Sequence, residues 1–180
     1  MKRTEWEHFR NLALPYFERA GIYLTEAEKA GLEVADLGLG EFETTGLVLH
    51  TYVNTARVCA KELVLLPHQT CPQHKHPPVG DDPGKEETFR VRWGTLYLYV
   101  EGEPTEAPKA RPPEGRQGTY TVFHEVVLAR GEQYTLAPDT WHWFQAGPEG
   151  AVVSEFSTRS RDELDRFTDP EIRRLPEVTP

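Results

Sequence analysis

The chain has 180 residues, of which 38% are hydrophobic and 27% charged, a composition typical of one globular domain. With 20 basic and 29 acidic residues its net charge is −9, which excludes a general nucleic-acid binder because such a protein needs a basic surface. Its apolar runs are too short to span a bilayer, and the residues after Met1 turn acidic without the apolar stretch of a signal peptide. We therefore expect a soluble cytoplasmic protein that binds neither nucleic acid nor membrane, in which Cys59 and Cys71 are reduced structural side chains.

The chain opens with a pattern that predicts two helices. Thr4 and Glu7 have the spacing of a capping box, and apolar residues follow at helical intervals until Pro15, which is expected to end or kink the helix. A second capping box at Thr25 predicts another short helix. We expect residues 1–32 to form a helical N-terminal arm.

Short runs rich in Val, Leu, Tyr and Thr then predict about eight β-strands within residues 33–158. No helical crossover lies between them, which favours an antiparallel sandwich or barrel over a parallel α/β fold. The expected strands are Gly46–Val53, Val58–Leu66, Thr88–Trp93, Thr95–Val100, Tyr120–Leu128, Gln133–Leu136, His142–Gln145 and Ala151–Ser157.

Two loops and a tail complete the pattern. Residues 77–84 are rich in Pro, Gly and Asp, and residues 102–118 contain four prolines. Long loops on a β scaffold often build binding sites, although a solvated connection explains the second loop equally well. Ser160 and Glu163 form another capping box, so residues 159–180 are expected to form a short helical tail on the same single domain.

The strongest chemical signal is His74-Lys75-His76. On a strand, residues two apart face the same side, so His74 and His76 can converge on one metal ion. A carboxylate, Glu87 or its rival Glu86, opens the next strand, and a third imidazole, His142, opens a later one. Three imidazoles and one carboxylate suit Mn, Fe, Co, Ni or Zn as divalent cations, and they leave two positions for a chelating substrate.

These residues follow the order of the two motifs of the cupins. The matching positions are His74, His76, Glu87, Gly94, Gly131 and His142. Ten residues separate His76 from Glu87 where cupins have three or four, so residues 77–84 resemble an insertion. The resemblance implies an all-β fold, a single cupin (double-stranded β-helix or jelly-roll) barrel with short N- and C-terminal helices.

A narrower resemblance covers the chain from about Leu24 to Pro176. The matching stretches are 70–78, 84–90, 93–99, 142–147 and 154–157. They resemble the D-lyxose isomerase family of cupins, which implies a metal-dependent aldose–ketose isomerase, usually with manganese and usually a homodimer; Co²⁺, Ni²⁺ and Fe²⁺ are alternatives. The family's metal ligands correspond to His74, His76, Glu87 and His142. Its lysine and its later glutamate correspond to Lys85 and Glu155.

The expected reaction converts D-lyxose to D-xylulose, and the same step converts D-mannose to D-fructose, through an enediol(ate). It needs a Lewis acid for the oxygens, a base for the carbon-bound proton and an acid for oxygen. Glu155 alternates in phase with Val153 and Ser157, and we expect it to be the base, with Lys85 serving the oxygen. Proton transfer and a metal-assisted hydride shift both remain open.

Further residues close to these motifs are candidates for binding a monosaccharide. They are Arg90, Tyr97, Trp143, Phe144 and Gln145. Two other functions use the same ligands: an iron-dependent cupin dioxygenase, which consumes oxygen, and a non-catalytic sugar-binding cupin, which binds sugar without turnover.

Overall fold

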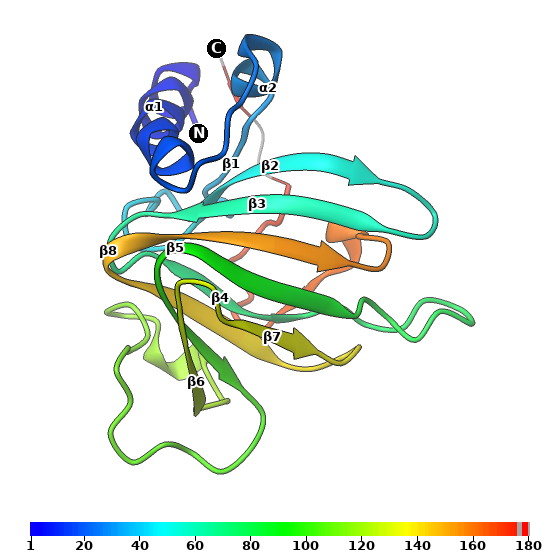
Figure 1. Ribbon diagram of the computed structural model, residues 1–180. Coiled ribbons are helices and arrows are strands. Elements are labelled where there is room, and N and C mark those ends of the chain that lie inside the picture. Colours follow the sequence, from blue (N-terminus) through cyan, green and yellow to red (C-terminus); the bar gives the residue numbers. More distant parts are fainter. Residues whose placement is uncertain (176–177, 180) are drawn as a thin grey trace.

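The computed structural model describes residues 1–175 and 178–179, which form a curled β-sheet with helices on one side (Figure 1). The helices of the described residues are α1 (Arg3–Arg19) and α2 (Glu26–Ala30). The strands are β1 (Glu33–Ala35), β2 (Leu47–Asn54), β3 (Cys59–Leu65), β4 (Thr70–Lys75), β5 (Glu87–Val100), β6 (His124–Ala129), β7 (Gln133–Leu136), β8 (His142–Ser157) and β9 (Arg166–Phe167). None of the helices described is long and apolar enough to cross a membrane.

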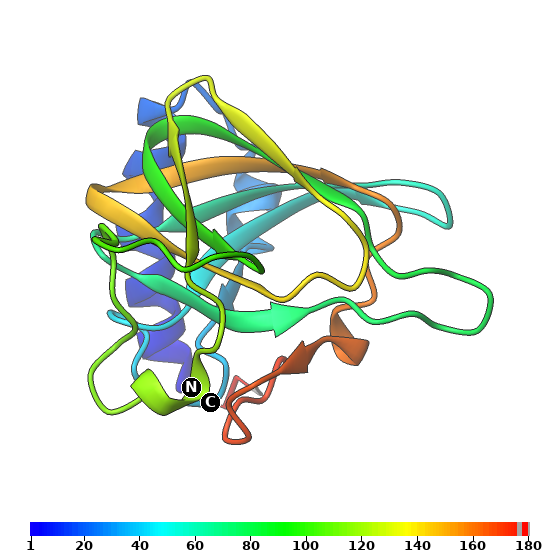
Figure 2. The same cartoon turned by 90° about the horizontal axis from the view of Figure 1, so that it is seen from below.

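Two long strands close the sheet. The order is β1-β2-β3-β8-β4-β9, and β5 pairs with β6, β7 and β8; all of these pairs are antiparallel. The first part of β8 lies between β4 and β5, and its last part between β3 and β5. Because β5 and β8 bend together, the sheet curls and brings their far ends to one side of the barrel (Figure 2).

The bend requires a glycine at residue 94. Gly94 has φ of 71°, and a Cβ atom there would lie 2.0 Å from the carbonyl oxygen of Gly150. A residue with a side chain would strain this backbone and force the two strands apart. The two strands expected over 88–93 and 95–100 are therefore one bent strand, β5, as the two expected over 142–145 and 151–157 are the bent β8.

The sheet buries apolar side chains on both faces. Inward-facing residues such as Leu63, Phe89 and Val153 fill the barrel. On the outer face, α1 packs Ala13 and Phe17 over the sheet, which buries an apolar cluster. The inner and outer clusters together place the helical arm against the sheet, with the barrel interior beneath it.

The helical arm differs from expectation at two points. The helix α1 begins at Arg3, two residues earlier than a cap at Thr4 predicts, because the backbone N–H of Lys2 donates to Glu5 (2.8 Å). It also continues through Pro15 to Arg19, since the buried face on either side of the proline holds the last turn to the sheet. The capping box at Thr25 is present as expected.

The C-terminal segment is not the expected helix. It forms one 3₁₀ turn at Asp162–Leu164 and the short strand β9, which pairs with β4. The predicted capping box fails because the hydroxyl of Ser160 donates to Asp162 instead. Residues 176, 177 and 180 of the expected tail lie outside the described residues. Strands β1, β4 and β9 lie outside the expected set, and the strand expected from Tyr120 starts only at His124.

Candidate metal centre and active site

A cavity lies inside the barrel on the side that the C-terminal segment covers. Its apolar lining comes largely from the barrel core and includes Leu63, Phe89, Phe144 and Phe167. Its polar lining consists of Lys61, His74, His76, Lys85, Glu87, Glu155, Asp162, Asp165 and Arg174. All six proposed catalytic and metal-binding residues except His142 thus line the cavity, and His142 is buried against it beside Glu87.

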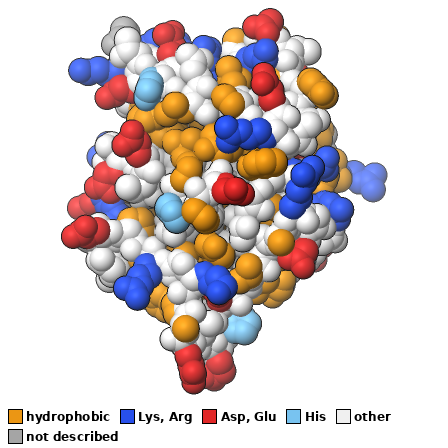
Figure 3. Space-filling model, turned by 60° about the vertical axis from the view of Figure 1, so that its left-hand side comes forward, with side chains coloured by type: hydrophobic (Ala, Val, Ile, Leu, Met, Phe, Trp, Pro, Cys, Tyr) orange, Lys and Arg blue, Asp and Glu red, His pale blue; other side chains and the backbone are white. Residues whose placement is uncertain are grey.

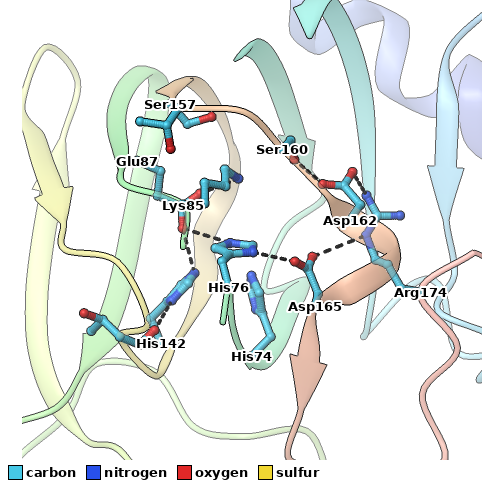
Figure 4. A network of polar contacts seen from close by, with 12 residues as sticks. His74, His76, Lys85, Glu87, His142, Ser157, Ser160, Asp162, Asp165 and Arg174 are labelled. Atoms are coloured by element: carbon cyan, nitrogen blue, oxygen red, sulfur yellow. Dashed lines mark hydrogen bonds and ion pairs between the residues drawn. The ribbon is translucent and has the colours of Figure 1, made fainter. Parts of the chain in front are cut away.

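Three histidines from two strands converge next to the cavity. His74 lies within β4 and His76 directly after it, whereas His142 starts β8. One nitrogen of each ring lies within 4.8 Å of the corresponding nitrogens of the other two, and all three residues are buried. Glu87, at the start of β5, places Oε1 3.2 Å from Nε2 of His76 and 3.1 Å from Nε2 of His142 (Figure 4).

The opposite ring nitrogens all face oxygen acceptors. Nδ1 of His74 lies 2.8 Å from the carbonyl of Pro72, and Nδ1 of His142 lies 2.9 Å from that of Thr140. Nδ1 of His76 lies 2.5 Å from a carboxylate oxygen of Asp165. Because Nδ1 of each ring keeps its proton and donates a hydrogen bond to one of these acceptors, a neutral ring has its lone pair on Nε2, where it can bind a cation.

The donor set fits a divalent cation. Nε2 of His142 is buried and lies 3.1 Å from Oε1 of Glu87. With the ring proton on Nδ1, which faces the carbonyl of Thr140, the lone pairs of Nε2 and Oε1 face each other, and a cation between them would satisfy both. Burial, with the neighbouring imidazoles, holds the pKa of His74 well below its ordinary value, so the ring is neutral. Burial also opposes a positive charge on His76, but Glu87 and Asp165 raise its pKa to about 9, so the ring without metal carries a second proton. A cation that binds to His76 would displace that proton.

A buried lysine joins the metal centre to a second carboxylate. Nζ of Lys85 lies 2.7 Å from Oε2 of Glu87 and 2.6 Å from Oε1 of Glu155. Burial would lower the pKa of Lys85, but the two carboxylates raise it well above its ordinary value, and the side chain remains a cation. Likewise, burial would raise the pKa of Glu87, but Lys85 and His76 hold it well below its ordinary value.

The structure separates the two adjacent glutamates. Glu87 is 2% exposed and faces the cavity, whereas Glu86 is exposed and its backbone N–H contacts Thr158. Strand alternation puts the two side chains on opposite faces of β5. Glu87 is therefore the carboxylate available to the histidines.

Of the five candidates for sugar binding, only Phe144 lines the cavity. Arg90 is exposed and donates to Gln133, and Tyr97 packs with the cluster around Trp143 outside the barrel. Trp143 stacks on Tyr99 there and donates its indole N–H to the carbonyl of Val122. Gln145 is occupied too: its amide donates to Thr70 and to the carbonyl of Arg111.

Four charged residues line the cavity without having been expected there. They are Lys61, Asp162, Asp165 and Arg174. The inward position of Lys61 could be predicted from the sequence, because Lys61 alternates in phase with the inward-facing Leu63 and Leu65 of β3. The C-terminal segment has neither helical nor strand periodicity, so no pattern in the sequence indicates that its charges enter the barrel.

Two solved structures of L-ribose isomerases have a similar fold. The L-ribose isomerase of Acinetobacter sp. DL28 has a TM-score of 0.78 at 15% identity, covering 96% of this chain and 94% of that one. The L-ribose isomerase of Cellulomonas parahominis has a TM-score of 0.77 at 17% identity over 96% and 94% of the two chains. At these identities the likeness concerns the fold alone, and it confirms the expected cupin-like barrel.

Much closer relatives exist in sequence. The chain is 60% identical to the D-lyxose ketol-isomerase of Cohnella laeviribosi over 99% of this chain and 98% of the relative. It is 57% identical to the D-lyxose/D-mannose isomerase of Thermosediminibacter oceani over the same shares. The family model described as D-lyxose isomerase matches residues 17–180. The chain therefore belongs to the D-lyxose isomerase family.

Proposed function

We propose that this chain is a metal-dependent aldose–ketose isomerase that converts D-lyxose to D-xylulose and D-mannose to D-fructose. The observation that supports it most is one buried cavity in which a His₃–Glu donor set adjoins the Lys85–Glu155 pair. The names of the relatives at 60% and 57% identity support the choice of sugars. D-lyxose and D-mannose share their configuration at C2, so one base at one position serves both.

The cation would be held by the three imidazoles and Glu87. Their mixed nitrogen and oxygen donors suit manganese, which we propose, and also cobalt, nickel and iron in the divalent state. When bound, such a cation supplies Lewis-acid polarisation of the sugar's carbonyl and neighbouring hydroxyl oxygens.

Glu155 is the proposed base. Its contacts with Lys85 (2.6 Å) and with the Ser157 hydroxyl (3.2 Å) both use Oε1, which leaves Oε2 to hold a proton. In our proposal Glu155 takes the proton from C2 of the aldose and returns it at C1, while the hydroxyl proton of O2 passes to the neighbouring O1, so that no net proton is gained or lost. Lys85 stays protonated and stabilises negative charge on the enediolate oxygen by a hydrogen bond.

The same pair distinguishes the isomerase from its rivals. A metal centre that activates oxygen, or one that only retains a sugar, does not require a base and a cation placed side by side in a buried cavity. Burying the charged side chains of Lys85 and Glu155 costs desolvation free energy, so such a pair inside a cavity points to a functional role. A base beside an ammonium group suits a reaction that transfers a proton.

We extend the proposal to a homodimer working in the cytoplasm. Its support is the family resemblance, together with exposed apolar side chains on β2, on β8 and in the turn before β3. These are Tyr52, Val53, Val58 and Phe156. The face drawn in Figure 3 intersperses acidic and basic side chains, a distribution unlike the basic stripe that follows a nucleic-acid backbone. Light scattering on the purified chain measures the oligomeric state, and a mass of one protomer would contradict the dimer.

A coupled assay tests the reaction. Metal-stripped protein is incubated with D-lyxose or D-mannose, with and without Mn²⁺, and ketose is measured. We expect ketose that depends on the added metal. Absence of ketose with metal bound would reject the isomerase, and oxygen consumption by the iron form would then favour the dioxygenase.

A further inference from the structure

The three histidines differ in what fixes their Nδ1 atoms. For His74 and His142 the acceptor is the backbone carbonyl two residues earlier, so the local chain provides it. For His76 the acceptor is a side chain, Asp165, which is 89 residues away in sequence. Of the three rings, His76 is therefore the one whose orientation depends on a distant segment. Its acceptor is a side chain, which a point mutation can replace.

Asp165 is held firmly where it reaches His76. Its side chain is 6% exposed, and its other oxygen lies 4.0 Å from Nε of Arg174 (Figure 4). The next residue, Arg166, pairs with Lys75 at the end of β4, so the strand that ends just before His76 also fixes the backbone beside Asp165. A buried, ionised carboxylate next to an imidazole N–H orients the ring and increases the basicity of the opposite nitrogen.

We propose that Asp165 is a positioning residue for the metal centre: it fixes the orientation and tautomer of His76 and thereby increases the affinity for the cation. The inference rests on the proposed metal centre and goes beyond it, because it makes the C-terminal segment part of that centre. In this proposal Asp165 acts through His76, to which its carboxylate is hydrogen-bonded.

The same segment supplies a matched control. Asp162, three residues earlier, is also a buried aspartate and also pairs with Arg174 (2.7 Å). Its remaining contacts are with Lys61 and Ser160, and among the described residues it makes no contact with a histidine. If Asp165 served only to dock the segment, loss of Asp162 would weaken the metal centre as much.

The experiment compares Asp165→Asn and Asp162→Asn in the full-length chain. Co²⁺ is titrated into each metal-stripped protein by calorimetry, without sugar, and the visible spectrum of the bound cobalt is recorded. The amide oxygen of Asn at position 165 can accept the hydrogen bond from the His76 ring but carries no negative charge. We therefore expect the affinity for Co²⁺ to be about 10- to 100-fold lower and the cobalt spectrum to be altered. We expect Asp162→Asn to bind within about threefold of the wild type.

Several results would overturn the inference. Unchanged affinity and spectrum in Asp165→Asn would do so, as would an equal loss in Asp162→Asn or a wild type that does not bind cobalt. If Asp165→Asn does not fold, Asp165→Glu, which keeps the charge but displaces it, must give the altered spectrum instead. A wild type that binds cobalt but makes no ketose would reject the proposed function, while the affinity ratio would still decide on Asp165.

Discussion

Lys85 decides the charge state of the cavity. Without it, Glu87 and Glu155 would be two buried carboxylates without a shared cation, and such neighbours hold a proton between them. Nζ of Lys85 lies 2.7 Å from Glu87, the proposed ligand, and 2.6 Å from Glu155, the proposed base, so one buried ammonium group is shared by both carboxylates. Lys85 therefore connects the proposed metal centre to the proposed proton-transfer step.

We predict that Lys85→Met lowers kcat on D-lyxose by about 100-fold or more, because one group that stabilises developing charge is lost. The assay is run at saturating Mn²⁺, with bound metal measured in parallel. Lys29→Met is the control, since Lys29 lies on α2 and pairs only with Glu26 there. A kcat equal to that of the wild type would remove Lys85 from the mechanism.

At this scale the sequence predicts which histidines and which carboxylate lie together, but of its five candidates for sugar contact only Phe144 lines the cavity. The H-x-H spacing and strand alternation place His74 and His76 together without any structure. Nearness in sequence to a ligand does not predict nearness in space, because alternate side chains leave the barrel. Trp143, next to His142, faces outward for that reason.

Among the elements, the C-terminal segment does most to complete the site. Ion pairs of its charged side chains hold this segment against the barrel, and its sequence has no apolar periodicity. Asp162 pairs with Lys61 (2.8 Å) and with Arg174 (2.7 Å). The strand hairpins were predictable from alternation and turns. The segment was not, since an ion pair such as Lys61–Asp162, whose residues are 101 apart, leaves no local pattern.

We predict that Asp162→Asn lowers the free energy of unfolding by about 3 kcal/mol at pH 7, because the buried Lys61 loses its carboxylate partner and Arg174 loses one of its carboxylate partners. Burial would raise the pKa of Asp162, but these cations hold it well below its ordinary value. A depressed carboxyl pKa stabilises the fold above about pH 4 and ceases to do so as pH falls through the folded value.

Urea unfolding of both proteins measures this difference between pH 7 and pH 2. The gap between wild type and variant should be constant above about pH 4 and narrow below it. A gap that is constant down to pH 2 would show that the Asp162 carboxylate does not supply the stability.

For the molecule as a whole, the closed barrel is what brings the proposed metal ligands together. They lie on β4 or directly after it and at the starts of β5 and β8, and these strand ends meet because the sheet bends at Gly94. The barrel itself follows from alternating strands without helical crossovers. Its curvature depends on long-range pairing between β5 and β8, which the sequence reveals only as two pairs of shorter strands.

We predict that removal of the metal lowers the melting temperature. A cation present at about 100 times its Kd contributes about 2.7 kcal/mol, which corresponds to about 5–10 °C for a chain of this length. Calorimetry of the protein with Mn²⁺ and with a chelator measures the shift. His142→Ala, which lacks one ligand, should show a much smaller shift, and an equal shift in that variant would place the cation elsewhere.

The central claim is that Glu155 moves the proton beside the metal centre, and ketose formation by Glu155→Gln tests it most directly. Glu62→Gln is the matched control, because Glu62 is a buried glutamate on the adjoining strand whose side chain bonds Ser154 on the outer face. With equal metal bound, we predict a loss of kcat of at least about 100-fold in Glu155→Gln and little change in Glu62→Gln. Turnover of D-lyxose by Glu155→Gln at the wild-type rate would contradict the account.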